Sequence, residues 1–218
     1  MTRVVAIVIA LIAVATVAPA AAVAGPHPVL LVHGYRGDPG TWQDMKAYLE
    51  RAGRTVYAID LSSENNVTNA RAIRDTLQAR GWSKVDLVGQ SMGGLSSRWF
   101  TKFLADGITV DAYVSIGTPQ YGLWSTCILP NGYGGQMCPS GWFLDQLNAG
   151  DDTPGDTYWT TIFSTGDQYV PNGRSRLDGG ACFVQVEGVG HNGMDNDPAV
   201  MAATLAGIDK RCAGTFRT

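Results

Sequence analysis

The sequence predicts an α/β fold in which strand–helix units build a mainly parallel sheet with helices on both faces. From Pro28 onward, short β-branched runs alternate with amphipathic stretches, which is the pattern of repeated βα units. The first run, at residues 29–32, is apolar on both of its faces, as a strand covered from both sides has to be. The chain has 218 residues, of which 45% are hydrophobic and 16% charged, so one domain can bury a large core without help from metals.

The expected elements follow in order. Thr41 is expected to cap the first helix, which ends at Gly53 and buries a stripe of Trp42, Met45 and Leu49. Further helices are expected around the apolar stripe Ala70, Ile73 and Leu77, at residues 92–104, and from Asp197 to about residue 209. The remaining strands are expected at residues 55–59, 85–88, 110–116, 158–163 and 183–186.

The first 25 residues are expected to lie outside the fold. Arg3 precedes an uncharged stretch, residues 4–24, that ends in small residues, as in a secretory signal cut after Ala24. An uncleaved membrane anchor is the alternative, because this stretch is long enough to cross about 30 Å of hydrocarbon. We therefore expect a secreted protein with a signal at residues 1–24 and a single domain at residues 25–218.

The charge and the cysteine content argue against a nucleic-acid partner and against a metal site. With 16 Lys and Arg against 19 Asp and Glu the net charge is −3, and the chain has no basic cluster, which argues against nucleic acid as a partner. In an exported chain the four cysteines predict two disulfides rather than a metal site, since there is no C-x2-C pair. They can be paired in three ways, and we favour Cys127 with Cys138 and Cys182 with Cys212.

The segment Gly89-Gln90-Ser91-Met92-Gly93 matches the pattern G-x-S-x-G. It falls at the end of an expected strand and directly before an expected helix, which is the setting of a nucleophile elbow. Gly89 and Gly93 leave the room that such a sharp turn requires. The alternative is a glycine-rich turn that contains a serine by chance.

A serine hydroxyl needs a base to remove its proton, and a carboxylate to orient that base. His191, in a loop after the last strand, is the favoured base, whereas His33 is expected to shape the loop after the first strand and His27 to be uninvolved. Asp167, just after the strand at residues 158–163, is the favoured acid, and Asp178 is its nearest rival.

Taken together, these segments resemble the small secreted bacterial lipases of lipase class 2, the minimal α/β-hydrolases of the Bacillus lipase type with their actinobacterial relatives. The shared segments are His33-Gly34, Gly89 to Gly94, Ser164-Thr165-Gly166-Asp167, Ser175 to Gly179 and Gly188-Val189-Gly190-His191. The resemblance implies an α/β-hydrolase fold with a parallel sheet of about six strands. It also implies hydrolysis of carboxylic esters by Ser91, Asp167 and His191, with an oxyanion hole from the backbone N–H groups of Tyr35 and Met92.

Such an enzyme needs no cofactor or metal, and we expect a monomer that acts on a small-molecule or lipid ester and touches lipid interfaces transiently. An acyltransferase, a polyester or cutin-type esterase, or a peptidase would use the same triad, and a non-catalytic binding module is a further alternative. The chain departs from the minimal lipases at residues 118–157, a cysteine-bearing excursion rich in Gly, Pro and aromatic residues. We expect this excursion to form either a wall for the acyl chain or a partial lid.

Overall fold

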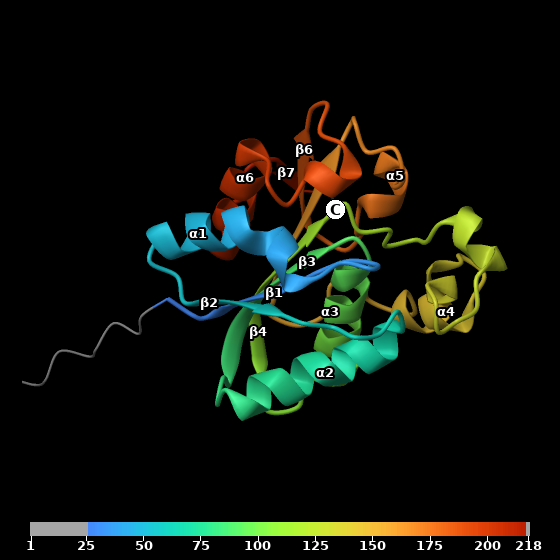
Figure 1. The fold of residues 1–218 in the computed structure, drawn as a ribbon, viewed down its shortest axis with the longest axis horizontal. Helices are drawn as coiled ribbons and strands as arrows, with labels where there is room; N and C mark the ends of the chain where they lie inside the picture. Colours follow the sequence, from blue (N-terminus) through green and yellow to red (C-terminus); the bar gives the residue numbers. More distant parts are fainter. Residues whose placement is uncertain (1–25, 217–218) are drawn as a thin grey trace, which may run out of the picture.

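The computed structural model describes residues 26–216 and has a seven-stranded sheet at its centre, in the order β2-β1-β3-β4-β5-β6-β7 (Figure 1). The signal expected at residues 1–24 lies outside the described residues. Six strands are parallel to one another: β1 (Val29–Val32), β2 (Val56–Ile59), β3 (Lys84–Gln90), β4 (Thr109–Ile116), β5 (Tyr158–Ser164) and β6 (Cys182–Val186). The parallel sheet with its helices is the predicted architecture.

The seventh strand was not expected. It is β7 (Thr215–Phe216), which pairs antiparallel with β6 at the edge of the sheet. Two residues are too few to show any periodicity, so this strand had no sequence signal. The disulfide between Cys182 and Cys212 ties the chain just before it to β6.

Helices cover both faces of the sheet (Figure 1). One face carries α1 (Gln43–Arg51) and α6 (Pro198–Ile208), whose buried side chains pack on Leu31, Val88 and Val114. The other face carries α2 (Asn66–Ala79) and α3 (Met92–Phe103), which pack on Leu30 and Leu87. Because strand side chains alternate between the two faces, neighbours such as Leu30 and Leu31 belong to different cores.

The start of the first helical segment differs from the prediction. A 3₁₀ turn, η1 (Pro39–Trp42), precedes α1, and the carboxylate of Asp38 accepts a hydrogen bond of 2.7 Å from Gly40 N at its beginning. Thr41 is therefore not the cap, and its hydroxyl instead donates to the carbonyl of Asp38. Asp38 rather than Thr41 is the N-cap because Pro39 follows it. A proline at the first position of a helical turn loses no hydrogen bond there, and its fixed φ suits the start of a helix.

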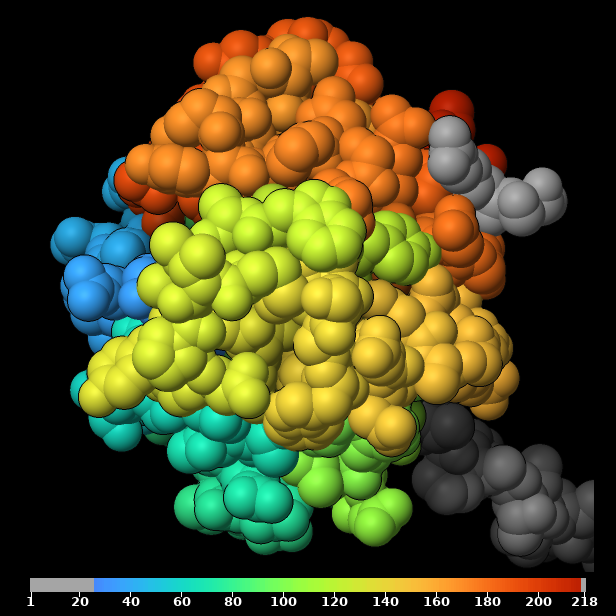
Figure 2. All heavy atoms as spheres, turned by 90° about the vertical axis from the view of Figure 1, so that its right-hand side faces the viewer, coloured from blue at the N-terminus to red at the C-terminus, as the bar shows by residue number. Residues whose placement is uncertain are grey.

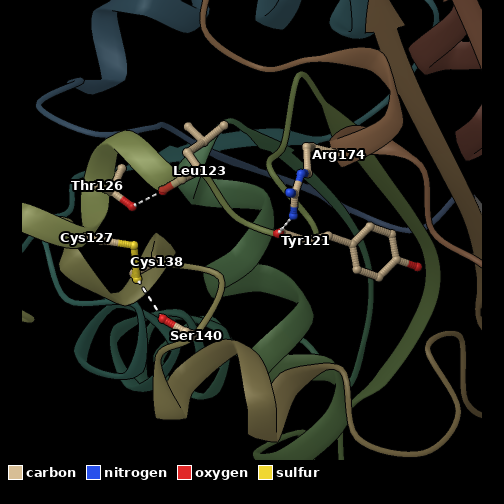
Figure 3. The surroundings of a disulfide bond; sticks show 7 residues. All are labelled: Tyr121, Leu123, Thr126, Cys127, Cys138, Ser140 and Arg174. Atoms are coloured by element: carbon tan, nitrogen blue, oxygen red, sulfur yellow. Dashed lines mark hydrogen bonds between the residues drawn. A yellow bond between two sulfur atoms is a disulfide. The ribbon is translucent and has the colours of Figure 1, made fainter.

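The excursion after β4 folds into two 3₁₀ turns, η2 (Trp124–Ile128) and η3 (Gly135–Met137), and the short helix α4 (Trp142–Leu147). The disulfide between Cys127 and Cys138 joins the two turns (Figure 3). This pair and Cys182 with Cys212 are linked as favoured from the sequence. Met137, Phe143, Leu144 and Leu147 form a third apolar cluster with Met92 and Leu95 of α3. The shorter elements α5 (Asn172–Ser175) and η4 (His191–Gly193) lie in the connections around β6.

Candidate active site

Ser91 lies in a strained turn between β3 and α3. Its φ is 53° and its ψ −125°, a backbone conformation that L-residues rarely adopt. The turn is tight enough that a Cβ on Gly89 would lie 2.6 Å from Gly94 N, and one on Gly93 would overlap the carbonyl oxygens of Val32 and His33. The glycines of the motif are therefore required by close backbone approach.

His191 and Asp167 form a hydrogen-bonded pair. The distance from His191 Nδ1 to Asp167 Oδ2 is 2.7 Å, and the two side chains are 8% and 1% exposed. Asp167 Oδ1 accepts hydrogen bonds from the N–H groups of Tyr169 and Val170, at 2.9 Å each, so both carboxylate oxygens are used. With Nδ1 committed to Asp167, the second ring nitrogen of His191 is the one available as a base. Asp178, the rival acid, lies elsewhere, and its N–H contacts the hydroxyl of Tyr121.

Ser91 and His191 line one cavity of about 370 Å³. Its opposite wall comes largely from the excursion, which contributes Leu123, Leu129 and Met137. Figure 2 shows the excursion, coloured yellow-green to gold, spread across the middle of this side of the molecule. In the close-up of Figure 3, Leu123 precedes the η2 turn, where the hydroxyl of Thr126 donates to its carbonyl at 2.7 Å. A larger cavity, of about 540 Å³, lies at the amino ends of the central strands β3 and β4, and neither Ser91 nor a histidine lines it.

Two backbone N–H groups beside Ser91 are available to an incoming oxyanion. Met92 is the first residue of α3, so its N–H has no acceptor within the helix. The N–H of Tyr35 makes no hydrogen bond within residues 26–216. Tyr35 borders the same cavity as Ser91, and a Cβ on the preceding Gly34 would lie 2.9 Å from Ser91 Cβ. The loop after β1 is thus held directly against the nucleophile turn.

His33 has the structural position expected of it. Its Nε2 accepts a hydrogen bond of 3.0 Å from Leu61 N, so its proton sits on Nδ1, 3.0 Å from the carbonyl of Gly34. The ring is buried and both nitrogens are occupied. It therefore fixes the shape of the loop that carries Tyr35.

Several further residues support the pair, and two of them, Gly117 and Gln168, were not found from the sequence. Gly117, directly after β4, has a φ of 54°, and a Cβ on it would lie 3.0 Å from Asp167 Oδ2 and 3.2 Å from His191 Nδ1. The side chain of Gln168 accepts from His191 N at 3.2 Å, and Gln90 Nε2 lies 3.4 Å from the carbonyl of His191. The sequence offered one indication of the role of Gly117, namely its position at the carboxyl end of an expected strand, where the site residues gather.

Asp195 is a second buried carboxylate close to the pair. It is 7% exposed, and burial raises its pKa to about 6, although the positive charge that His191 can carry opposes this. Within residues 26–216, no group of three or more His, Cys, Asp or Glu side chains could hold a metal ion. In the same part of the chain, no helix has the length and apolar character needed to cross a membrane.

The chain is similar to known hydrolases. It is 32% identical over 110 residues to a triacylglycerol lipase of Pseudarthrobacter phenanthrenivorans, a match that covers 44% of this chain and 34% of the relative. It is 29% identical over 150 residues to methylesterase 2 of Arabidopsis thaliana, covering 62% and 56% of the two chains. The chain thus spans about a third of the length of the lipase and just over half of that of the methylesterase.

The fold is shared with the structure of a monoacylglycerol lipase of Paleococcus ferrophilus, with a TM-score of 0.66 and 16% identity over 85% of this chain and 97% of that one. The model of the "Alpha/beta hydrolase family" matches residues 29–171, which include β1 to β5, Ser91 and Asp167. The chain therefore belongs to the alpha/beta hydrolase family.

Proposed function

We propose that residues 25–218 form a secreted serine hydrolase that cleaves carboxylic esters through Ser91, His191 and Asp167. One observation carries the proposal. Ser91 lies in a strained turn and lines the same cavity as His191, whose Nδ1 is hydrogen-bonded to the buried carboxylate of Asp167. The relatives named for lipase and methylesterase activity support an ester as the substrate. The two disulfides support export, because such bonds persist in oxidising compartments.

The mechanism follows from the positions of these groups. His191 takes the proton of the Ser91 hydroxyl as the oxygen attacks the ester carbonyl, and Asp167 stabilises the imidazolium that forms. The N–H groups of Tyr35 and Met92 donate to the oxyanion of the tetrahedral intermediate. His191 then gives its proton to the departing alcohol, and water hydrolyses the acyl-enzyme by the same route. The leucines and Met137 of the cavity wall accommodate the acyl chain.

Large apolar side chains on the excursion suit contact with an insoluble substrate. Ile128 is 89% exposed and Trp124 63%, and Tyr133 and Trp142 are exposed as well. No residue from Thr118 to Leu144 carries a charge, so this surface can approach a lipid interface at little desolvation cost. Trp and Tyr favour such interfaces because their rings are apolar with one polar end.

The proposal is tested with purified protein and p-nitrophenyl butyrate. Ser91→Ala and Asp167→Asn are each expected to lower kcat by about 10³-fold or more. Ser83→Ala, at an exposed serine just before β3 and at the opposite end of that strand, is the matched control. A fluorophosphonate is expected to label the wild type and Ser83→Ala but not Ser91→Ala. Undiminished ester cleavage by Ser91→Ala would refute the proposal.

A further inference from the structure

The loop after β1 closes in a tight turn of four residues, Gly34 to Gly37. The N–H of Gly37 donates to the carbonyl of Gly34 at 3.1 Å, so Tyr35 and Arg36 are the two central residues. Arg36 has a φ of 54°, whereas Tyr35 is not among the residues with a positive φ. A positive φ at the third position alone defines a type II turn, which normally has Gly or Asn there. Arg36 is thus held in a conformation that its side chain disfavours.

The side chain of Glu64 opposes the alternative turn. Its Oε1 accepts a hydrogen bond of 3.0 Å from the N–H of Arg36, which belongs to the peptide between the two central residues. In a type I turn this peptide is roughly reversed, and the third residue returns to a φ of about −90°. The reversal would turn the Arg36 N–H away from Glu64 and bring the carbonyl oxygen of Tyr35 toward the carboxylate. The carboxylate therefore favours the type II form.

Glu64 is itself held by its neighbours. It directly precedes Asn65, the N-cap of α2, whose side chain accepts from Thr68 N at 2.9 Å. The carbonyl of Glu64 accepts from Gly134 N at 3.3 Å, and Glu64 pairs with Tyr133 in an isolated β-bridge. Its backbone thus joins the start of α2 to the excursion, while its side chain reaches the turn.

The turn that Glu64 holds lies against the nucleophile. A Cβ on Gly34 would lie 2.9 Å from Ser91 Cβ, and one on Gly134 would lie 3.1 Å from Tyr35 Cε2. The N–H of Tyr35, one of the two proposed oxyanion donors, belongs to the first peptide of the turn. A donor stabilises an oxyanion only when it is placed about 3 Å from the position where the charge develops. A change in the shape of the turn would therefore weaken this donor.

From these contacts we infer that Glu64 is a positioning residue of the proposed oxyanion hole. Its carboxylate holds residues 34–37 in the type II form and so keeps the Tyr35 N–H directed at the oxyanion. The inference rests on the proposed function and adds to it a residue outside the triad. Glu64 does not line the cavity that contains Ser91, so it acts through the turn and not on the substrate. A hydrogen bond to a carboxylate is strong enough to offset the cost of one disfavoured backbone conformation.

The test compares two replacements of Glu64 with p-nitrophenyl butyrate as substrate. Glu64→Met keeps the length of the side chain and removes the acceptor oxygen, whereas Glu64→Gln keeps an acceptor. Losing an oxyanion donor outright costs about 10² to 10³ in kcat, so a misplaced donor should cost about tenfold. We expect Glu64→Met to lower kcat by about tenfold with KM changed by less than about twofold, and Glu64→Gln to keep kcat within about threefold.

An alkyl boronic acid supplies a second measurement, because it forms a tetrahedral adduct with a nucleophilic serine. Glu64→Met is expected to weaken its binding by about the same tenfold as it lowers kcat. Neither KM nor the inhibition constant depends on the fraction of the enzyme that is folded. The comparison therefore separates a misplaced donor from a partly unfolded preparation.

Two further variants serve as matched controls. In an Arg36→Gly background the turn keeps its positive φ without strain, so adding Glu64→Met should lower kcat by about threefold or less. Asn65→Ala removes the cap of α2 beside Glu64 and should cost about 1 kcal/mol of stability while leaving kcat near that of the wild type.

Four outcomes would overturn the inference. They are an unchanged kcat in Glu64→Met, an equal loss in Glu64→Gln, an equal loss in Asn65→Ala, and the full tenfold loss when Glu64→Met is added to Arg36→Gly. A wild type that does not cleave the ester, or a Ser91→Ala variant that cleaves it undiminished, would instead reject the proposed function. The two failures are therefore distinguishable.

Discussion

Asp86 provides a test of the electrostatics of the sheet. It lies in β3 with a side chain that is 1% exposed, and the guanidinium of Arg54 approaches its Oδ2 at 3.5 Å. Burial raises the pKa of Asp86 to about 7, even though the positive charge of Arg54 lowers it. Arg54 also pairs with Asp209, so its charge is shared between two carboxylates.

The sign of the effect on stability follows from proton binding. In the unfolded chain Asp86 is ionised above about pH 4, whereas in the folded protein it keeps its proton up to about pH 7. The folded state therefore binds more protons between these values, and stability falls as the pH rises from 4 to 7 and then levels off. Each tenfold change in the dissociation constant corresponds to about 1.4 kcal/mol, so the full loss is about 4 kcal/mol.

Asp86→Asn removes this titration and keeps the shape of the side chain. We expect the variant to gain stability relative to the wild type between pH 4 and pH 8, by an amount approaching about 4 kcal/mol. Urea unfolding followed by tryptophan fluorescence at several pH values measures it. Asp75→Asn, at a side chain that is 63% exposed, is the control and should show little such trend. A constant difference between wild type and Asp86→Asn across this range would refute the reasoning.

Two further substitutions test the packing around the site. Gly93→Ala places a Cβ against two backbone carbonyls and should lower the free energy of unfolding in urea by about 3 kcal/mol or more. Gly173→Ala is the control, because nothing lies within 4 Å of a Cβ there, and it should be nearly neutral. Arg98→Met should cost about 3–5 kcal/mol in the same assay, because the buried guanidinium donates to Asp152 at 2.5 Å and Asn148 at 2.6 Å. Full stability of either Gly93→Ala or Arg98→Met would contradict these contacts.

Features that depend on local pattern were predicted well from the sequence. The strand at residues 85–88 is β3 with one added residue at its start and two at its end, and the last helix begins after Asp197 as expected. Apolar runs and capping residues specify these elements within a few positions. Ser91 and His191 could be proposed for the same reason, since each follows an expected strand.

Features that depend on distant contacts were not predicted. The role of Gly117 follows from the approach of the end of β4 to the His191–Asp167 pair, a contact between segments far apart in the chain. The internal turns of the excursion also lacked a signal, because they are held by a disulfide and by tertiary hydrogen bonds rather than by a periodic pattern.

The contacts of the excursion favour a fixed wall over a movable lid. Lys102 of α3 donates to the carbonyls of Leu147 and Asp151, at 2.7 and 2.8 Å, and Arg98 binds the same segment. At the other end, Arg174 donates to the carbonyl of Tyr121 at 2.7 Å (Figure 3). Opening the excursion would break these bonds and expose Phe143 and its apolar neighbours. We therefore expect access to Ser91 to depend on the shape of the cavity mouth rather than on movement of the whole excursion.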